Sequence, residues 1–142
     1  MIWNVQGLDK KLYQRDFIDF CTNNDILSCS EIHNCTKEKI MKYFNNYDVY
    51  VSHRIGYSGG GVAVCVRKAL SNIVTFVNTE TSECILLHVK KSYLNIEKDL
   101  IICFPYIPHY YSMVFEKTVT KGIDRLMDLY NKVTLNIRTF IG

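Results

Sequence analysis

The chain has 142 residues, of which 48% are hydrophobic and 22% are charged, and this balance excludes a disordered polypeptide. Its length allows one domain with a real core, but not two comfortable ones. The formal net charge of +3 is too small to argue for nucleic-acid binding by itself. No apolar run reaches the roughly 18 residues of a membrane span, and the first residues lack a secretory leader, so we expect an intracellular protein with no membrane partner.

Apolar periodicity in the first third of the chain predicts strands that alternate with helices. Tyr13, Phe17, Phe20 and Cys21 recur at the spacing of one helical face, and Thr36 is placed to cap a short helix. The expected elements are a strand at 2–5, a helix at 10–22, a strand at 26–30, a helix from 36 to 42 and a strand at 47–52.

A glycine cluster at residues 56–61 leads directly into an apolar strand at 62–66. A phosphate-binding P-loop would place its glycines before a helix and follow them with Gly-Lys-Ser or Gly-Lys-Thr, so this motif is not favoured. We interpret the cluster as a loop or bulge before a buried strand.

The second half of the chain predicts mainly strands, then one long helix. Pro105 and Pro108 indicate an irregular loop, because proline cannot continue a strand ladder. The expected elements are strands at 73–77, 84–89 and 100–104, the loop at 104–109, an amphipathic helix at 113–132 and the beginning of a strand at 139–142. This order favours an α/β layered sandwich with a mixed sheet.

The chain contains six cysteines, which we interpret as small buried hydrophobes in a reducing compartment rather than as a disulfide framework. Four of them lie inside apolar, strand-like runs: Cys29, Cys65, Cys84 and Cys103. The group of Cys29, His33 and Cys35 matches none of the usual zinc spacings, so zinc is not favoured.

Polar side chains follow three of the predicted strands and suggest chemistry. Asn4 ends the first strand, Glu31 follows the second, and Tyr106 with His109 follows the strand that ends at Phe104. A carboxylate with a nearby amide is a suitable oxygen-donor site for Mg²⁺ or Mn²⁺, because hard cations take few protein ligands and keep several waters. A tyrosine hydroxyl nearby could hydrogen-bond a phosphate oxygen, and the metal would polarise a phosphodiester.

Simpler interpretations remain open for the same residues. A lone Glu31 could be a solvated loop residue, Asn4 a turn former, and Tyr106 a ring that packs on the loop prolines. The basic pairs at 10–11, 67–68 and 90–91 are most simply solvated turns, although any of them could contact a phosphate backbone.

Four short blocks occur in a fixed order: WNVQGL at 3–8, LSCSEIH at 27–33, GGVAV at 60–64 and YIP at 106–108. Together they resemble the successive blocks of the endonuclease/exonuclease/phosphatase family, and more narrowly the apurinic-type endonuclease domain of non-LTR retrotransposons. The resemblance implies the DNase I-like fold, a four-layer α/β sandwich with two packed sheets. It also implies divalent-metal-dependent cleavage of DNA, with Mg²⁺ or Mn²⁺ and no small-molecule cofactor, and a nuclear location.

The resemblance carries roles onto individual positions. Glu31 falls on the metal-binding glutamate, Asn4 on the asparagine that supports the metal and phosphate site, and Tyr106 on the tyrosine that faces the scissile phosphate. Ile32 replaces the more usual threonine. Gln6 stands where relatives have an acidic residue or asparagine, and His109 stands where many have asparagine.

Two later blocks of that family, Gly-Asp-Phe-Asn and Ser-Asp-His, have no counterpart in these residues. We therefore expect residues 1–142 to be the N-terminal part of such a domain, truncated to its first half or so, and inactive alone. The alternative is a non-catalytic remnant that keeps weak metal or nucleic-acid binding, or that has no function. Half a sandwich would leave apolar strand faces exposed.

Overall fold

The computed structural model describes residues 1–54, 59–77 and 84–106. They belong to the first of two compact units, Met1–Tyr106 and Ile107–Gly142. The strands of the described part are β1 (Ile2–Asn4), β2 (Ile26–Ser30), β3 (Tyr47–Ser52), β4 (Val62–Arg67), β5 (Val74–Val77), β6 (Cys84–Val89) and β7 (Leu100–Pro105). The helices are α1 (Leu8–Lys11), α2 (Arg15–Cys21), α3 (Lys37–Tyr43), α4 (Lys91–Leu94) and a 3-10 turn, η1 (Lys68–Leu70).

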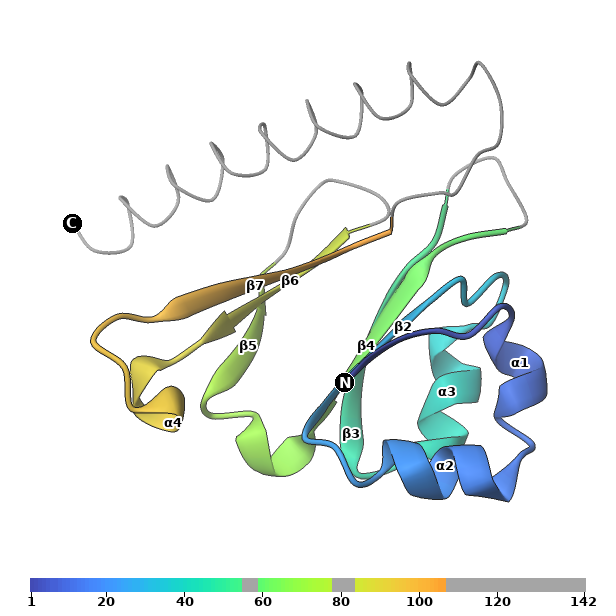
Figure 1. Cartoon of the computed structure of the whole chain (residues 1–142), viewed down its shortest axis with the longest axis horizontal. Coiled ribbons are helices and arrows are strands. Elements are labelled where there is room, and N and C mark those ends of the chain that lie inside the picture. The colour runs from blue at the N-terminus through green and yellow to red at the C-terminus, as the bar shows by residue number, and fades with distance from the viewer. Residues whose placement is uncertain (55–58, 78–83, 107–142) are drawn as a thin grey trace, which may run out of the picture. The chain divides into compact units, whose positions relative to one another are not determined.

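Two sheets form the centre of this unit (Figure 1). The first is mixed, with the order β1-β2-β4-β3, in which β1 runs parallel to β2 and the other pairs are antiparallel. The second is antiparallel, with the order β5-β6-β7. Helices α1, α2 and α3 cover one face of the first sheet, and the second sheet lies on its other face. The predicted α/β sandwich with a mixed sheet is confirmed.

Strand β4 joins the two hydrophobic cores of the sandwich. Alternate side chains of a strand point to opposite faces, so Ala63 and Cys65 enter the core under the helices, while Val62, Val64 and Val66 enter the core between the sheets. All five are at most 2% exposed. The continuous apolar run at 62–66 is therefore explained by burial on both faces.

The single helix expected at 10–22 is wrong. Two helices, α1 and α2, are separated by a break, and Gln14 has extended dihedral angles. Leu8, Leu12, Phe17 and Cys21 are all buried. In a continuous helix, the five-residue step from Leu12 to Phe17 would place the Phe17 side chain about 140° away from that of Leu12 around the helix axis. The break is therefore needed for all four side chains to face the core.

The end of β7 also differs from expectation. Pro105 is the last residue of the strand and pairs with Cys84, instead of starting an irregular loop. An edge strand tolerates proline because its outward backbone groups need no ladder partner. Cys103 is exposed on this same strand, so the expectation of a buried residue is wrong there.

Helix α3 begins as predicted. The Thr36 hydroxyl oxygen accepts a hydrogen bond from the backbone N–H of Lys39 at 3.3 Å, and Glu38 lies in the first turn. Hydrogen bonds from the helix start lower the pKa of the Glu38 carboxyl. The helix expected at 113–132, the strand expected at 139–142 and the residues Pro108 and His109 lie outside the described residues.

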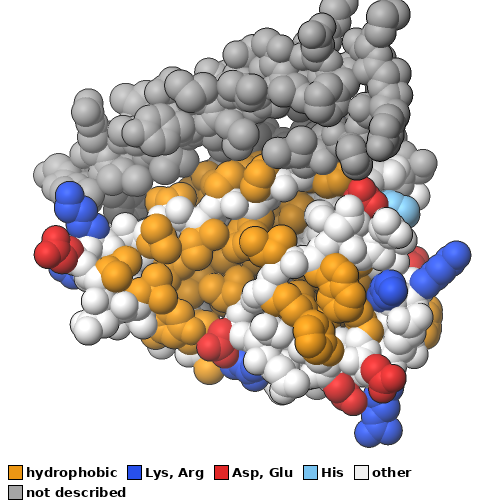
Figure 2. Space-filling model, viewed as in Figure 1, with side chains coloured by type: hydrophobic (Ala, Val, Ile, Leu, Met, Phe, Trp, Pro, Cys, Tyr) orange, Lys and Arg blue, Asp and Glu red, His pale blue; other side chains and the backbone are white. Residues whose placement is uncertain are grey.

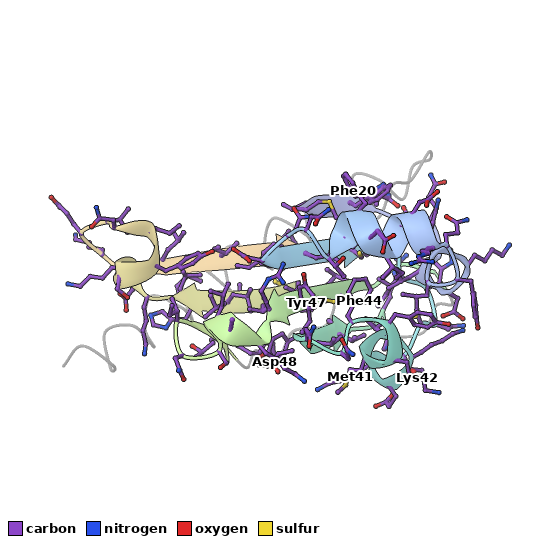
Figure 3. All side chains as sticks on the ribbon, turned by 90° about the horizontal axis from the view of Figure 1, so that it is seen from below. Phe20, Met41, Lys42, Phe44, Tyr47 and Asp48 are labelled. Carbon is purple, nitrogen blue, oxygen red and sulfur yellow. The ribbon has the colours of Figure 1, made fainter. Side chains whose placement is uncertain are left out.

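Hydrophobic side chains gather on the face of the described unit that carries the edge strands β1 and β7 (Figure 2). Ile2 on β1 is 76% exposed, and Leu100 on β7 is 38% exposed. Trp3 packs against helix α2, with its ring 5.3 Å from Phe17 and 5.7 Å from Phe20. Figure 3 shows Phe20 on the outside of α2, and Phe44 and Tyr47 in the interior.

No helix among the described residues is long and apolar enough to cross a membrane.

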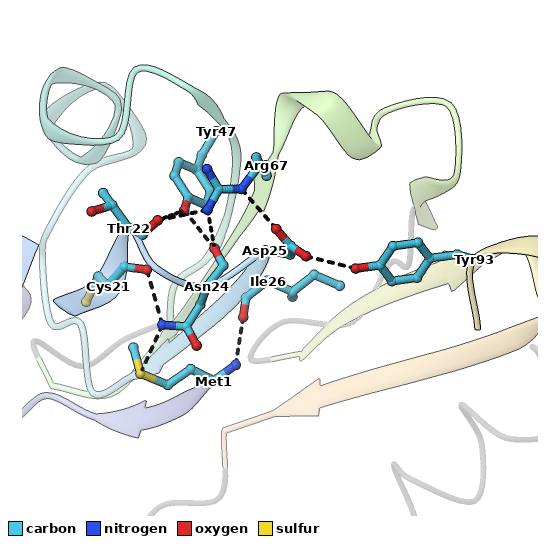
Figure 4. A network of polar contacts seen from close by, with 9 residues as sticks. All are labelled: Met1, Cys21, Thr22, Asn24, Asp25, Ile26, Tyr47, Arg67 and Tyr93. Atoms are coloured by element: carbon cyan, nitrogen blue, oxygen red, sulfur yellow. Dashed lines mark hydrogen bonds and ion pairs between the residues drawn. The ribbon is translucent and has the colours of Figure 1, made fainter. Parts of the chain in front are cut away.

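A polar network holds the loop after α2 against the first sheet (Figure 4). The buried Tyr47 hydroxyl lies 2.7 Å from the Asn24 carbonyl oxygen, and Arg67 donates to the Thr22 carbonyl at 2.8 Å and to the Asp25 carboxylate at 3.0 Å. Burial raises the pKa of Tyr47. Arg67 thus has structural partners, so the interpretation of the pair at 67–68 as a solvated turn is wrong for Arg67, whereas Lys68 is exposed in the turn η1.

We expect Tyr47→Phe to lower the free energy of unfolding by about 1 kcal/mol, because it removes a hydroxyl that lies 2.7 Å from the Asn24 carbonyl oxygen. Urea denaturation measures this change. Tyr93→Phe is the comparison, since its hydroxyl donates to the solvated Asp25 carboxylate in the same network, and its effect should stay below about 0.5 kcal/mol. Equal effects of the two variants would contradict the structural role of the Tyr47 hydroxyl.

Candidate functional site

Several strands of the unit end, or begin, at the same edge of the sandwich. Strands β1 and β2 run parallel, and Asn4 pairs with Ser30, so Asn4 and Glu31 lie at neighbouring strand ends. Strand β3 ends at this edge too, because it and β2 are both antiparallel to β4. Strand β4 begins here, directly after Gly60 and Gly61. The convergence expected for Asn4 and Glu31 is therefore present in the backbone.

The backbone at this edge is unusually rich in left-handed conformations. Gln6, Glu31 and His33 have φ angles of +48°, +58° and +56°. Gly60 and Gly61 have φ angles of +89° and +82°. Non-glycine residues adopt such angles at a cost of about 1–3 kcal/mol each, and they persist where surrounding contacts enforce them, commonly at functional sites.

Glu31 is held by its backbone rather than by its side chain. Its N–H donates to the Gly61 carbonyl at 2.9 Å, and its own carbonyl accepts from the Gly7 N–H at 2.8 Å. The next residue, Ile32, is fully buried and anchors the segment. Within the described part of the chain, the Glu31 carboxylate makes no hydrogen bond or ion pair, so its oxygens can accept a ligand.

Asn4 forms the turn that follows β1. Its side-chain oxygen accepts a hydrogen bond from the backbone N–H of Gln6 at 3.1 Å, and the residue is exposed. The turn-forming role considered for Asn4 is thus real. An amide oxygen has two lone pairs, so the same atom can still accept from, or coordinate, a second group.

Tyr106 reaches the same edge from β7 and lies against the glycine segment. A Cβ atom added to Gly60 would lie 2.6 Å from Cε1 of Tyr106, so the ring sits where a side chain would otherwise be. The ring also packs against the core between the sheets. The Gly60 carbonyl accepts from the His33 N–H at 2.9 Å, so Tyr106 and the Glu31 segment contact the same glycine pair.

Two further residues lie at this edge that the sequence reasoning did not place there. Arg54 follows β3, and its Cδ would lie 3.3 Å from a Cβ on Gly60. The His53 ring nitrogen Nδ1 lies 3.2 Å from the His33 carbonyl oxygen. Both follow the strand at 47–52, so the rule that parallel strands end at one edge was the available signal.

The donors at this edge suit a hard cation only in part. A carboxylate and an amide oxygen are the right chemical types for Mg²⁺ or Mn²⁺, which can be held by one or two carboxylates with waters and phosphate oxygens. No group of three or more His, Cys, Asp or Glu side chains that could hold a metal occurs among the described residues.

An open groove of about 480 Å³ lies beside α3, β3 and β5 and shares His53 with the edge that carries the candidate site. Its lining includes Lys37, Tyr50 and His53, but not Asn4, Glu31 or Tyr106. The candidate site is therefore a strand-end surface and not this groove.

No model of a known protein family matches the sequence, and no curated protein matches it. Solved structures do. The chain is similar to D. rerio TDP2 complexed with single strand DNA product, with a TM-score of 0.55 and 15% identity over 92% of this chain and 53% of that chain. It is also similar to humanized D. rerio TDP2 (TM-score 0.56, 16% identity, 89% and 56% covered) and to truncated Caenorhabditis elegans TDP2 (TM-score 0.52, 16% identity, 93% and 55% covered).

The chain has a DNase I-like fold. At these identities the likeness shows the fold alone. The chain spans about half the length of the TDP2 structures that it matches. The described residues supply three layers of this fold, which are the helices α1–α3 and the two sheets.

We expect Gly60→Ala to destabilise the protein by about 1–2 kcal/mol, because the new side chain would be in the left-handed region and would collide with the Tyr106 ring. Thermal denaturation followed by circular dichroism measures the loss. The matched control is Gly59→Ala, since a Cβ at Gly59 meets nothing within 4 Å and its φ is not in the left-handed range. A control that loses as much stability would show that the Tyr106 contact is not the cause.

Proposed function

We propose that this strand-end surface is part of a divalent-metal site that binds nucleic-acid phosphodiesters. In this proposal Glu31 holds the metal, Asn4 supports the metal and phosphate, and Tyr106 faces the phosphate. The observation that carries it is that Glu31 and Tyr106, which follow different strands, contact one left-handed glycine pair, while Asn4 lies at the neighbouring strand end beside Ser30. Three distant polar residues at one strained edge are more typical of a site than of a solvated loop.

Two further observations support the nucleic-acid part of the proposal. The DNase I-like fold is shared with TDP2, one structure of which contains single strand DNA product. Arg54 lies beside Gly60, and its cationic side chain is suited to a phosphate group. The sequence blocks around Asn4, Glu31 and Tyr106 add the narrower proposal that the chain descends from the endonuclease of a non-LTR retrotransposon.

A bound Mg²⁺ or Mn²⁺ would polarise the phosphodiester and stabilise negative charge in its transition state. The residues of this chain would position the metal and the phosphate. Two backbone hydrogen bonds of Glu31 and the burial of its neighbour, Ile32, hold the segment that carries the Glu31 carboxylate. Tyr106 is fixed by its packing against Gly60, which places its ring beside the same loop.

We further propose that these 142 residues bind but do not cleave. Among the described residues of the site, Glu31 is the single carboxylate, and the Gly-Asp-Phe-Asn and Ser-Asp-His blocks that would supply a water-positioning aspartate and a histidine have no counterpart in the sequence. Without a base or acid, phosphodiester hydrolysis loses the contribution of general acid–base catalysis, about 10²–10⁴-fold.

We expect binding of a fluorescent single-stranded DNA to strengthen when Mg²⁺ is added and to weaken when EDTA removes it, as measured by fluorescence anisotropy. Glu31→Gln should abolish this Mg²⁺-dependent part, a loss of about tenfold or more in affinity. Glu97→Gln is the matched control, because it removes the same charge from an exposed position before β7. Equal Mg²⁺ dependence of DNA binding in the wild type and in Glu31→Gln would exclude Glu31 as the metal ligand. A DNA affinity of the wild type that does not change with Mg²⁺ would favour a remnant without a metal site.

Incubation of the purified chain with supercoiled plasmid and Mg²⁺ or Mn²⁺ tests the catalytic part. We expect no nicked plasmid above the level seen with Glu31→Gln on an agarose gel. Nicking by the wild type that disappears in Glu31→Gln would show that the chain is an active endonuclease and that our proposal of binding without cleavage is wrong.

A further inference from the structure

Cys84 and Cys103 lie side by side across the β6–β7 ladder. The antiparallel register pairs Cys84 with Pro105 and Leu86 with Cys103, so the two cysteines are diagonal neighbours on one face of the sheet. Their sulfur atoms are 3.3 Å apart. A disulfide requires about 2.05 Å, so the two sulfurs must approach each other further to form the bond.

The other cysteines are in a different environment. Cys21, Cys29, Cys35 and Cys65 are buried in the core between the helices and the first sheet. Burial raises the pKa of Cys21 to about 11 and that of Cys29 to about 12. These thiols are inaccessible and protonated at neutral pH, so they are poor nucleophiles.

Cys103 differs from them in both respects. It is exposed on the edge strand β7. The hydrogen bond with Cys84 lowers the pKa of the Cys103 thiol and raises that of Cys84. The exposed sulfur is thus the better nucleophile, and a second sulfur lies next to it to resolve an oxidised product.

We propose that Cys84 and Cys103 form a redox modification site, in which a hydroperoxide oxidises the pair to a disulfide across β6 and β7. The reaction has two balanced steps. The Cys103 thiolate attacks one oxygen of hydrogen peroxide, the O–O bond breaks, the leaving hydroxide takes a proton to become water, and the sulfur becomes a sulfenic acid. The Cys84 sulfur then attacks the Cys103 sulfur, the S–S bond forms and the S–O bond breaks, and the hydroxyl group takes the Cys84 thiol proton and leaves as a second water.

In total, two thiols are oxidised and one peroxide is reduced to two waters. Under reducing conditions both cysteines are free thiols, and a disulfide of this kind forms only transiently. The bond would connect β6 and β7 just before Tyr106, and it would make the ladder between these strands harder to open. The proposal does not depend on metal or nucleic-acid binding.

The test treats the purified 142-residue chain with hydrogen peroxide, denatures it, alkylates it with N-ethylmaleimide and measures the intact mass. We expect the oxidised chain to take up two fewer labels than the reduced chain, and reduction to restore them. Peptide mapping should find one cross-linked species that contains Cys84 and Cys103. The oxidised protein should also melt at a higher temperature than the reduced protein.

Three variants assign the roles. Cys103→Ser should lose no labels after peroxide treatment. Cys84→Ser should stop at the sulfenic acid, which dimedone traps on Cys103. Cys65→Ser, which removes a buried thiol, should still form the disulfide.

The peptide map of the peroxide-treated wild-type chain tests the proposal even if a variant does not fold. A different cysteine pair, an intermolecular bond on a non-reducing gel, or full labelling after peroxide treatment of folded protein would each overturn the proposal.

Discussion

Burial of β4 on both of its faces is the constraint on which the rest of the described unit depends. Its alternate residues enter two different cores, so the helices must cover one face and the second sheet must cover the other. The same strand pairs with β2 and β3 on its two edges. A strand enclosed in this way cannot shift its register without exposing apolar side chains, and its first residues therefore have a defined position.

The defined start of β4 fixes the backbone of the candidate site. Gly60 and Gly61 precede the strand, and their carbonyls accept hydrogen bonds from His33 and Glu31. A side chain at Gly61 would meet Ile32 at 3.1 Å and the Ser52 carbonyl at 3.2 Å, and one at Gly60 would meet Tyr106. Close packing of the segments that contain Ile32, Ser52 and Tyr106 thus requires glycine at both positions. The same packing holds Glu31 and His33 in left-handed conformations.

Sequence patterns were reliable where local chemistry decides the outcome. The Thr36 cap, the buried run at 62–66 and the strands at 26–30, 47–52 and 84–89 were all predicted from capping, burial and alternation. The continuous helix at 10–22 failed because the spacing from Leu12 to Phe17 suits the core only if the helix breaks. Exposure of Cys103 was missed because an apolar run does not reveal which strand lies at an edge.

By itself, the sequence determined the types of element, their order, and the candidates Asn4, Glu31 and Tyr106, since these follow from residues close together in the chain. Only the tertiary structure decided which strand ends meet, that Tyr106 packs on Gly60, that Arg67 anchors the loop at Asp25, and that the sulfurs of Cys84 and Cys103 are neighbours. The physical reason is that these contacts join residues 19 or more positions apart, and the register and packing of the sheets, rather than local preference, bring them together.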